Sequence, residues 1–311
     1  MAERYVDHQQ ARWEAYLARH GVDKLLRDLT SDLLANEPLD PRSFLIDSLR
    51  TGPTANAAGK RRYGWRRDLF DRGVATFDVA ALEIGAGKAP ESHDLRAAGP
   101  TPPLLDQGSV GAGAACAVLT AVAFDAMRRG DAVPDTSCLF LYYNARDLDG
   151  AVDADCGATI SRAVEALSRF GAPPETAWPF VPGRLFERPA LTAYEAAVAM
   201  TAEHKKLPKT EAALCRVLFL GLVVTIGFSV YEAFDESASR GGAMAVPEVG
   251  ERVVGGHGAI VVGYCRRQRH VIVQNSFGSK WGDAGYFYMP WDFFFSEDVD
   301  CWVVEAKPND A

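Results

Sequence analysis

The side chains best suited to nucleophilic or metal chemistry in this 311-residue chain are its six cysteines: Cys116, Cys138, Cys156, Cys215, Cys265 and Cys301. They form no C-x-x-C pair, and no histidine lies near them at the spacing of zinc ligands. The sequence therefore predicts no metal site and no cofactor. Most of them lie in apolar stretches such as AACAVL and VVGYCRR, where a free cysteine behaves as a small hydrophobe. We expect all six to be reduced thiols in a reducing compartment.

A basic cluster in the first quarter of the chain could bind anions. Aromatic side chains interleave with it, as in nucleic-acid-binding patches; the residues are Lys60, Arg61, Arg62, Tyr63, Trp65, Arg66 and Arg67. Asp68 and Asp71 follow at once, and the whole chain has a formal charge of −8. An acidic molecule repels nucleic acid and anionic membranes, and a short basic run usually lies on a solvated face. We therefore expect no nucleic-acid partner.

The elements that would position a site begin with an apolar helix. The segment DLRAAGPTPPLLDQGSVGAGAACAVLTAVAFDAM contains a Pro-rich stretch, a Gly-rich turn and a helix from Ala114 to Met127. It resembles the start of a papain-like (C1) cysteine peptidase, where a similar turn leads to the nucleophilic cysteine and a long central helix. The positions that match this pattern are Gln107, Gly108, Ser109 and Gly111.

Two later stretches carry the same resemblance. GERVVGGHGAIVVGY resembles the strand that presents the family's histidine, here His257, and VIVQNSFGSKWGDAGYFYMPWDFF resembles the segment that carries its asparagine, here Asn275. DCGATISRAVEALSRFGAPPETAWPF and VVTIGFSVYEAF are more similar to the soluble bacterial-type branch than to the secreted lysosomal branch. The resemblance spans roughly residues 64–306. It implies a papain-like α+β fold with a helical left lobe and an antiparallel right lobe.

The sequence departs from the family pattern at the nucleophile. Counted from Gln107 without a gap, the position of the catalytic cysteine falls on Gly113. Acyl transfer in this family requires a thiolate, which the imidazolium of the paired histidine stabilises. An oxyanion hole and a base cannot replace the missing sulfur. The resemblance therefore implies a catalytically inactive pseudopeptidase with a remnant site made of Gln107, Gly113, His257 and Asn275.

Cys116 is the alternative nucleophile. It lies three residues after Gly113, one helical turn deeper, so its sulfur would sit about 4.5 Å along the helix axis from the required place. Since catalysis is sensitive to misplacements of about 1 Å, the use of Cys116 would require a rearranged loop. A water activated by the histidine is a further alternative. The second hypothesis is therefore an active cysteine endopeptidase that uses Cys116.

Other positions also depart from the family pattern. Phe277 replaces the tryptophan that usually shields the asparagine, which is a tolerable aromatic exchange. Val110 replaces a cysteine that forms a disulfide in secreted members, so Cys156 has no evident partner, which favours a reducing compartment. Four histidines match none of these motifs and are expected at the surface or at helix ends: His20, His93, His204 and His270.

The N-terminal region predicts a helical hairpin. Apolar residues repeat at helical spacing from Val22 to Leu34, and Asn36-Glu37-Pro38 ends this helix. A second short helix is expected to carry Phe44. A hairpin of this size buries too little surface alone. Its apolar stripe must therefore pack against the body, a second copy or a partner helix.

The stretch GVDKLLRDLTSDLLANEPLDPRSFLIDSL resembles the dimerisation and docking domain of the type II regulatory subunit of cAMP-dependent protein kinase. The resemblance implies pairing with another docking-domain chain and a groove for an amphipathic helix of a structural or anchoring protein. Such modules also occur in ciliary and flagellar proteins, including radial-spoke components of the axoneme. The implied partner-binding residues are Val22, Leu25, Leu26, Leu29, Leu33, Leu34 and Phe44. A hairpin that packs only on its own chain remains the alternative.

These patterns divide the chain into a docking-like module (1–51), a linker that leads into the body (52–93), a papain-like domain (94–306) and a tail (307–311). Strands are expected at 222–230, 259–264, 271–274 and 286–289.

The longest strongly apolar stretch without a charge runs from Val217 to Tyr231. It is shorter than the roughly 18 residues needed to span a membrane, and we expect it to be a core strand. The N-terminus has charges of both signs and no apolar signal region. We therefore expect a cytoplasmic scaffold or docking component of a larger assembly, with an axonemal location in a cilium or flagellum implied by analogy alone.

Overall fold

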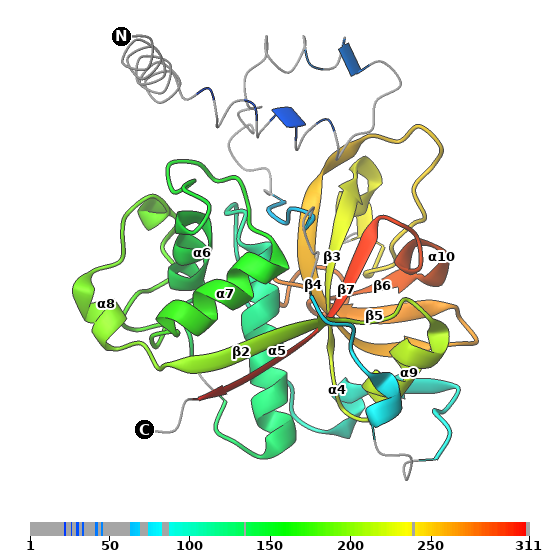
Figure 1. Cartoon of the computed structure of the whole chain (residues 1–311). Helices are drawn as coiled ribbons and strands as arrows, with labels where there is room; N and C mark the ends of the chain where they lie inside the picture. Colours follow the sequence, from blue (N-terminus) through cyan, green and yellow to red (C-terminus); the bar gives the residue numbers. More distant parts are fainter. Residues whose placement is uncertain are drawn as a thin grey trace, which may run out of the picture. The chain divides into compact units, whose positions relative to one another are not determined.

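The computed structural model describes residues 63–68, 74–82, 87–133, 135–237 and 240–308, and eight separate residues between 22 and 45. The chain divides into two compact units, Met1–Ala58 and Gly59–Ala311. The helices and strands labelled in Figure 1 belong to the second unit. None of the described helices is both long and apolar enough to cross a bilayer.

The described residues of the first unit are helical. Val22, Leu26, Leu29 and Leu33 have helical backbone, as their spacing predicts, and so do Thr30, Pro41, Arg42 and Leu45. The Thr30 hydroxyl donates a hydrogen bond to the Leu26 carbonyl (2.7 Å). The Leu26 side chain is 56% exposed. Three expected partner-binding residues, Leu25, Leu34 and Phe44, lie outside the described residues.

One half of the second unit is built from helices around a long buried one. The α-helices of this half are α5 (Gly113–Arg129), α6 (Cys138–Asp147), α7 (Ile160–Phe170) and α8 (Leu191–Glu195), whereas α4 (Leu95–Ala98), α9 (Glu211–Phe219) and α10 (Trp291–Phe294) lie beside the strands of the other half (Figure 1). Short 3-10 helices are η1 (Val79–Ala81), η2 (Pro182–Arg184) and η3 (Glu232–Ser237). Helix α5 is buried all round from Gly113 to Ala126, because its small side chains let other elements pack on every face.

Capping residues fix the ends of these helices. Ser137 and Thr159 accept hydrogen bonds from the backbone of the first turns of α6 and α7. Helix α5 has no side-chain cap at its start, where Ala112 occupies the capping position. At its other end Gly130 adopts φ 80°, a left-handed conformation that glycine favours, and its N–H bonds to the Ala126 carbonyl.

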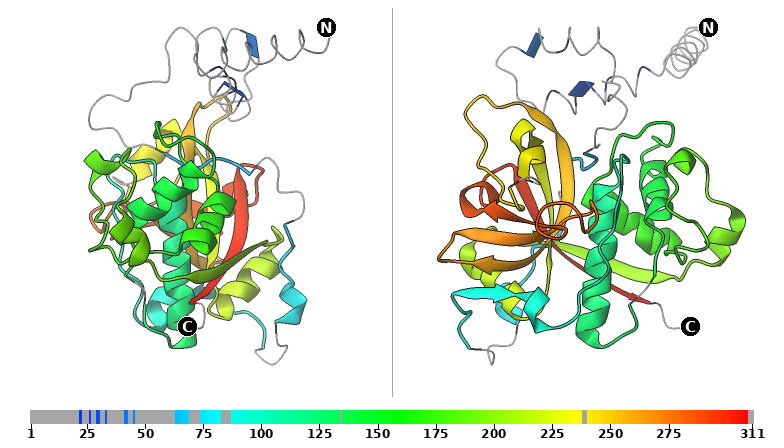
Figure 2. Two further views of the ribbon diagram at one scale, coloured as in Figure 1. Left: turned by 60° about the vertical axis from the view of Figure 1, so that its left-hand side comes forward. Right: turned by 180° about the vertical axis from the view of Figure 1, so that it is seen from behind.

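The other half is an antiparallel sheet. Its strands are β1 (Ser92–Asp94), β2 (Met200–Lys206), β3 (Val224–Tyr231), β4 (Val253–Cys265), β5 (His270–Gln274), β6 (Tyr286–Pro290) and β7 (Val299–Pro308). They pair in the order β2-β7-β3-β4-β5-β6, and β1 pairs with β4. In the view from behind, α5 lies between the strands and the remaining helices of its lobe (Figure 2).

Two hydrophobic cores correspond to two lobes. One core joins α5, α6 and α7, and includes Leu139, Tyr142 and Trp178. The other lies in the β-lobe, where Phe228, Phe287 and Phe294 are almost fully buried. This arrangement confirms the predicted papain-like α+β fold.

Two details of the sequence-based interpretation are wrong. The stretch Val217–Tyr231 is not one strand: its first residues complete α9, and β3 begins only at Val224. Gly221, with φ 80°, makes the turn between them. His93, His204 and His270 are partly buried on β1, β2 and β5 and do not lie at helix ends. His20 lies outside the described residues.

Candidate active site

The start of α5 faces the middle of β4, where glycines allow close approach. Gly113 is the first residue of α5, and His257 lies on β4 next to Gly258. A Cβ atom on Gly258 would lie 2.9 Å from the Cα of Ala114, which is closer than a real side chain tolerates. A glycine at 258 therefore lets β4 carry His257 directly against the first turn of α5.

His257 is oriented by Asn275. The side-chain oxygen Oδ1 of Asn275 accepts a hydrogen bond from the backbone N–H of Ser276 (2.8 Å) and lies 2.7 Å from Nε2 of His257. Because the Ser276 N–H can only donate, this atom of the amide must be the oxygen. Nε2 of His257 must then carry a proton. In the neutral ring, the basic nitrogen is Nδ1, which faces Gly113.

Aromatic rings enclose His257, whose exposed fraction is 0%. Phe277 stacks on the imidazole, with ring centroids 4.8 Å apart and an angle of 23° between the planes. Phe228 and Tyr63 meet the ring edge to face, at 5.7 and 5.9 Å. The imidazole is therefore held from several sides, and its position is set by packing as well as by Asn275.

Gln107 is held in place by Ser276, the residue that follows Asn275. Its backbone N–H donates to the Ser276 carbonyl (2.9 Å), and its Oε1 accepts from the Ser276 hydroxyl (2.6 Å). Its Nε2 donates to the Val110 carbonyl (2.7 Å). The carbonyl can only accept, so the amide orientation is determined. Gln107 thereby ties the turn before α5 to the residue that follows Asn275.

Gly113 and His257 are in close contact. A Cβ atom built on Gly113 would lie 2.6 Å from Nδ1 and 2.9 Å from Cε1 of His257. Real Cβ atoms essentially never approach this closely, so any side chain at 113 would require the imidazole to move. The structure thus brings Gln107, Gly113, His257 and Asn275 together, with a base and its orienting amide but no side chain at residue 113 to act as a nucleophile.

Cys116 points to a different neighbour. Its side chain is 1% exposed, and its sulfur lies 2.9 Å from the sulfur of Cys138 at the start of α6. This places the thiol inside the helical lobe, as the predicted extra helical turn requires. All six cysteines are free thiols in the structure. Within the described part of the chain, no cluster of His, Cys, Asp and Glu could hold a metal ion.

A segment from the supposed linker lies across this site. We call residues 63–68 the strap. The Trp65 N–H donates to the carbonyl of Gly256 (2.6 Å), next to His257, and the Arg66 N–H donates to the carbonyl of Ala158 (3.1 Å). The Ala158 N–H returns a bond to the Gly64 carbonyl (2.8 Å). The strap is therefore bonded by its backbone to both lobes.

Glycines make the room that the strap occupies. A Cβ on Gly64 would lie 1.8 Å from the Gly111 carbonyl oxygen, and one on Gly157 would lie 2.0 Å from the Gly64 oxygen. A Cβ on Gly227 would lie 2.0 Å from the Trp65 indole, which is only 6% exposed. Since the strap's backbone and its indole fill these spaces, they are part of the packed structure around the site.

Side chains anchor the strap as well. The Tyr63 hydroxyl donates to Asp235, Arg66 pairs with Asp149, and Arg67 donates to the Glu297 carbonyl. Arg66 is therefore not on a freely solvated face, contrary to the expectation for the basic cluster; Lys60, Arg61 and Arg62 lie outside the described residues. The Arg67 side chain is exposed and is held by its hydrogen bond to the Glu297 carbonyl.

Asp68 ends the strap in a small polar network. The Ser161 hydroxyl donates to Asp68 (3.1 Å) and lies 2.8 Å from Nε2 of His204. Because the hydroxyl's one proton goes to the carboxylate, Nε2 of His204 must donate to it. Burial lowers the pKa of His204, and the negative charge of Asp68 opposes that shift.

Sequence reasoning missed the strap because Arg66 and Arg67 belong to a short basic run, which usually lies on a solvated face. The local signals were its aromatic side chains, Tyr63 and Trp65.

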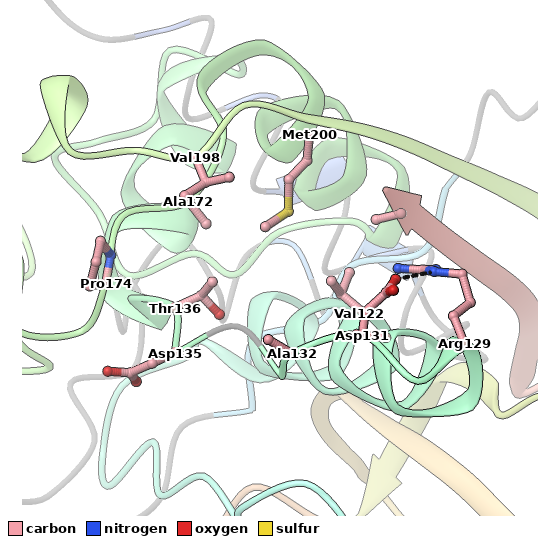
Figure 3. Close-up of a pocket in the computed structure, with 12 residues that line it drawn as sticks. Val122, Arg129, Asp131, Ala132, Asp135, Thr136, Ala172, Pro174, Val198 and Met200 are labelled. Carbon is pink, nitrogen blue, oxygen red and sulfur yellow. Dashed lines mark hydrogen bonds and ion pairs between the residues drawn. The ribbon is translucent and has the colours of Figure 1, made fainter. Parts of the chain in front are cut away.

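A hollow of about 270 Å³ lies beside the C-terminal half of α5, with an Arg129–Asp131 ion pair (2.7 Å) at its wall (Figure 3). Val122, Val198 and Met200 make it mainly apolar. It is a different place from the His257 site.

Comparison with known proteins agrees with this fold. A family model described as "Papain family cysteine protease" matches residues 89–293. An uncharacterized peptidase C1-like protein, L477, of Acanthamoeba polyphaga mimivirus is 32% identical over 216 residues, covering 65% of this chain and 69% of that protein.

Solved structures show the same fold. Xylellain, a cysteine protease from Xylella fastidiosa, is 28% identical with a TM-score of 0.67, covering 79% of this chain and 98% of that one. ProCathepsin B S9 from Trypanosoma congolense is 16% identical with a TM-score of 0.63, covering 80% and 87%.

Proposed function

Because the chain belongs to the papain family of cysteine proteases, we propose that it is a catalytically silent member in which Gly113 occupies the nucleophile position. The observation that carries this proposal is the contact between Gly113 and His257. A Cβ atom on residue 113 would lie 2.6 Å from Nδ1 of His257, so the basic nitrogen of the imidazole faces residue 113. Glycine offers that nitrogen no proton to remove and no atom to attack a carbonyl.

The remaining groups cannot complete the reaction. A thiolate must form a bond to the carbonyl carbon of the substrate before the histidine can protonate the leaving amine. His257 could act as a base and Asn275 could hold it, but both assist a nucleophile that Gly113 does not supply. Loss of the nucleophile alone removes most of the rate enhancement of such a site.

The position of Cys116 supports the same proposal. Its sulfur is buried against Cys138, on the second turn of α5, whereas His257 contacts the first residue of that helix. To reach the imidazole, the sulfur would have to leave the helical core. The active-peptidase alternative, with Cys116 as the nucleophile, therefore requires a large rearrangement of the first two turns.

The strap gives the silent site a structural role. Its backbone bonds to Gly256 in one lobe and to Ala158 in the other, and its side chains pair with acidic groups of both. In this proposal the strap, which is a segment of the same chain, occupies the site and joins the two lobes. The body is then a rigid scaffold rather than a peptide-cleaving enzyme.

The proposed scaffold includes the first unit as a docking module. Support comes from the helical backbone at the apolar positions Val22, Leu26, Leu29 and Leu33, and from the exposed Leu26 side chain. A partly exposed apolar stripe favours pairing with a second hairpin and binding of an amphipathic partner helix. The organelle in which such an assembly would form, including a cilium or flagellum, is proposed only from the resemblance of this module.

Cleavage of an unstructured protein substrate tests the proposal. The wild-type chain should give no cleavage above a buffer control. Cleavage that the Cys116→Ser variant abolishes would establish the alternative. Cleavage that persists in Cys116→Ser but is lost in His257→Ala would point to a histidine-activated water and would equally overturn the proposed silence.

A further inference from the structure

Two helices of the helical core, α5 and α6, meet at a pair of cysteines. Cys116 lies on the second turn of α5, and Cys138 is the first residue of α6. Their sulfur atoms are 2.9 Å apart, and the two side chains are 1% and 3% exposed. A disulfide bond has a sulfur separation of 2.03–2.05 Å, so the two atoms need to approach by only about 0.9 Å.

We propose that Cys116 and Cys138 form a dithiol–disulfide site that joins α5 to α6 covalently, with a small-molecule disulfide such as oxidised glutathione as its oxidant. This inference does not depend on the proposed function. It revises the sequence-based expectation that all six cysteines stay reduced, for these two residues only.

The reaction balances in two exchange steps. The thiolate of one cysteine attacks a sulfur of the small disulfide, which forms a mixed disulfide and releases one small thiol. The thiolate of the second cysteine then attacks the protein-side sulfur of the mixed disulfide and releases the second small thiol. The two protein thiols lose two electrons and two protons, and the small disulfide is reduced to two thiols.

Burial decides when this reaction can occur. A hydrogen bond with Cys116 and desolvation hold the pKa of Cys138 well above its usual range. The reactive form of cysteine is the thiolate, and an exchange reagent must also reach the sulfur. The fully folded protein should therefore react slowly. We expect the bond to form while the chain folds, or when the helical lobe opens, and then to be protected from reductants.

The position of the pair gives the bond a structural consequence. Cys116 and Cys138 are 22 residues apart, so the bond would close a short loop that contains the rest of α5 and the turn after it. Such a loop constrains the unfolded chain. The oxidised form should melt roughly 5–10 °C above the reduced form.

Refolding of the full chain tests the proposal. The reduced chain is unfolded and refolded with oxidised glutathione or with dithiothreitol, free thiols are alkylated in denaturant, and peptides are mapped by mass spectrometry. The glutathione sample should lose two alkylation sites, yield a linked Cys116–Cys138 peptide pair and show the higher melting temperature. Cys116→Ala and Cys138→Ala should lose all three effects.

A matched control uses another buried cysteine. Cys301 lies on β7 and is 4% exposed, so Cys301→Ala removes a similar sulfur but should leave the linked peptides and the melting shift unchanged. A second experiment incubates folded protein with oxidised glutathione in sub-denaturing urea. Its alkylated and linked cysteines are mapped by the same mass spectrometry, without a refolding step. The proposal is overturned if all six cysteines are alkylated in both experiments, or if the linked pair involves any other cysteine to an equal extent.

Discussion

The indole of Trp65 occupies the space that a side chain at position 227 would need. A Cβ atom on Gly227 would lie 2.0 Å from both Cε2 and Nε1 of this ring. Gly227 lies on β3, far from the strap in sequence, and the Trp65 ring is almost completely buried. The fit of one aromatic ring over one glycine therefore links the strap to the sheet of the β-lobe.

The Gly227→Ala variant should displace the strap. Because the added methyl group collides with the ring itself, Trp65 has to leave its place, at a cost comparable to the 3–5 kcal/mol of a buried Trp→Ala change. The melting temperature should fall by about 6–15 °C. Limited trypsin digestion provides a second readout, since Arg66 and Arg67 lie in the strap and should be cut much faster in the variant.

Gly183 supplies the matched control for this experiment. A Cβ on Gly183 would meet nothing within 4 Å, so Gly183→Ala should change neither the melting temperature nor the tryptic pattern. If Gly227→Ala melts like the wild type and keeps the strap resistant to trypsin, the strap does not hold Trp65 against β3.

Acid should weaken the fold partly through His204. Because burial lowers the pKa of His204, the unfolded chain, with a pKa near 6.5, takes up this proton at a higher pH than the folded protein. Its contribution to stability is therefore complete above pH 6.5 and is lost as the pH falls through the lower pKa of the folded state. Melting temperatures measured from pH 8 to pH 5 should decrease.

The His204→Gln variant isolates this contribution. Glutamine can still donate a hydrogen bond to Ser161 but does not titrate, so its melting temperature should decrease less between pH 8 and pH 5. Burial also lowers the pKa values of His93 and His270, so some acid sensitivity should remain. An equal decrease in the wild type and the variant would show that His204 does not contribute.

The first unit should mediate dimerisation. Light scattering coupled to size exclusion should give twice the chain mass for the full chain, because burial of the partly exposed apolar stripe is favourable. Leu26→Asp places a charge in that stripe and should give a monomer. Ser31→Asp, at a position outside the apolar repeat Val22, Leu26, Leu29 and Leu33, should remain a dimer. A monomeric wild type, or a dimeric Leu26→Asp variant, would contradict this role.

The sequence predicted the fold where residues carry local signals. The Gly-rich turn before α5 and the apolar runs of β3, β5 and β6 indicated these elements within a few residues, whereas β4 begins at Val253, six residues before the expected start at 259. The sequence missed β1, β2 and β7, and the charged pattern of Met200–Lys206 gave little indication of a strand. Their places depend on pairing with distant partners, as in the registers of β2 with β7.

Of the candidate site, the sequence predicted only the residues whose side chains could take part in catalysis. Resemblance pointed to His257 and Asn275, and the structure adds the 2.7 Å contact that fixes the proton on Nε2. The strap was not predictable, because its arginines are typical of a solvated basic run and the bonds of Trp65 reach residues far along the chain. The contact between Cys116 and Cys138 is equally non-local, since it depends on how two helices cross.

Intact-mass measurement after treatment with an epoxide inhibitor of cysteine peptidases tests the central claim most directly. Trp65→Ala loosens the strap, so that a blocked site and an absent nucleophile can be told apart. The account predicts no adduct on Trp65→Ala, and one adduct on Trp65→Ala combined with Gly113→Cys, formed slowly because the imidazole must first move away from the introduced side chain. A single adduct on Trp65→Ala alone that His257→Ala abolishes would contradict the account.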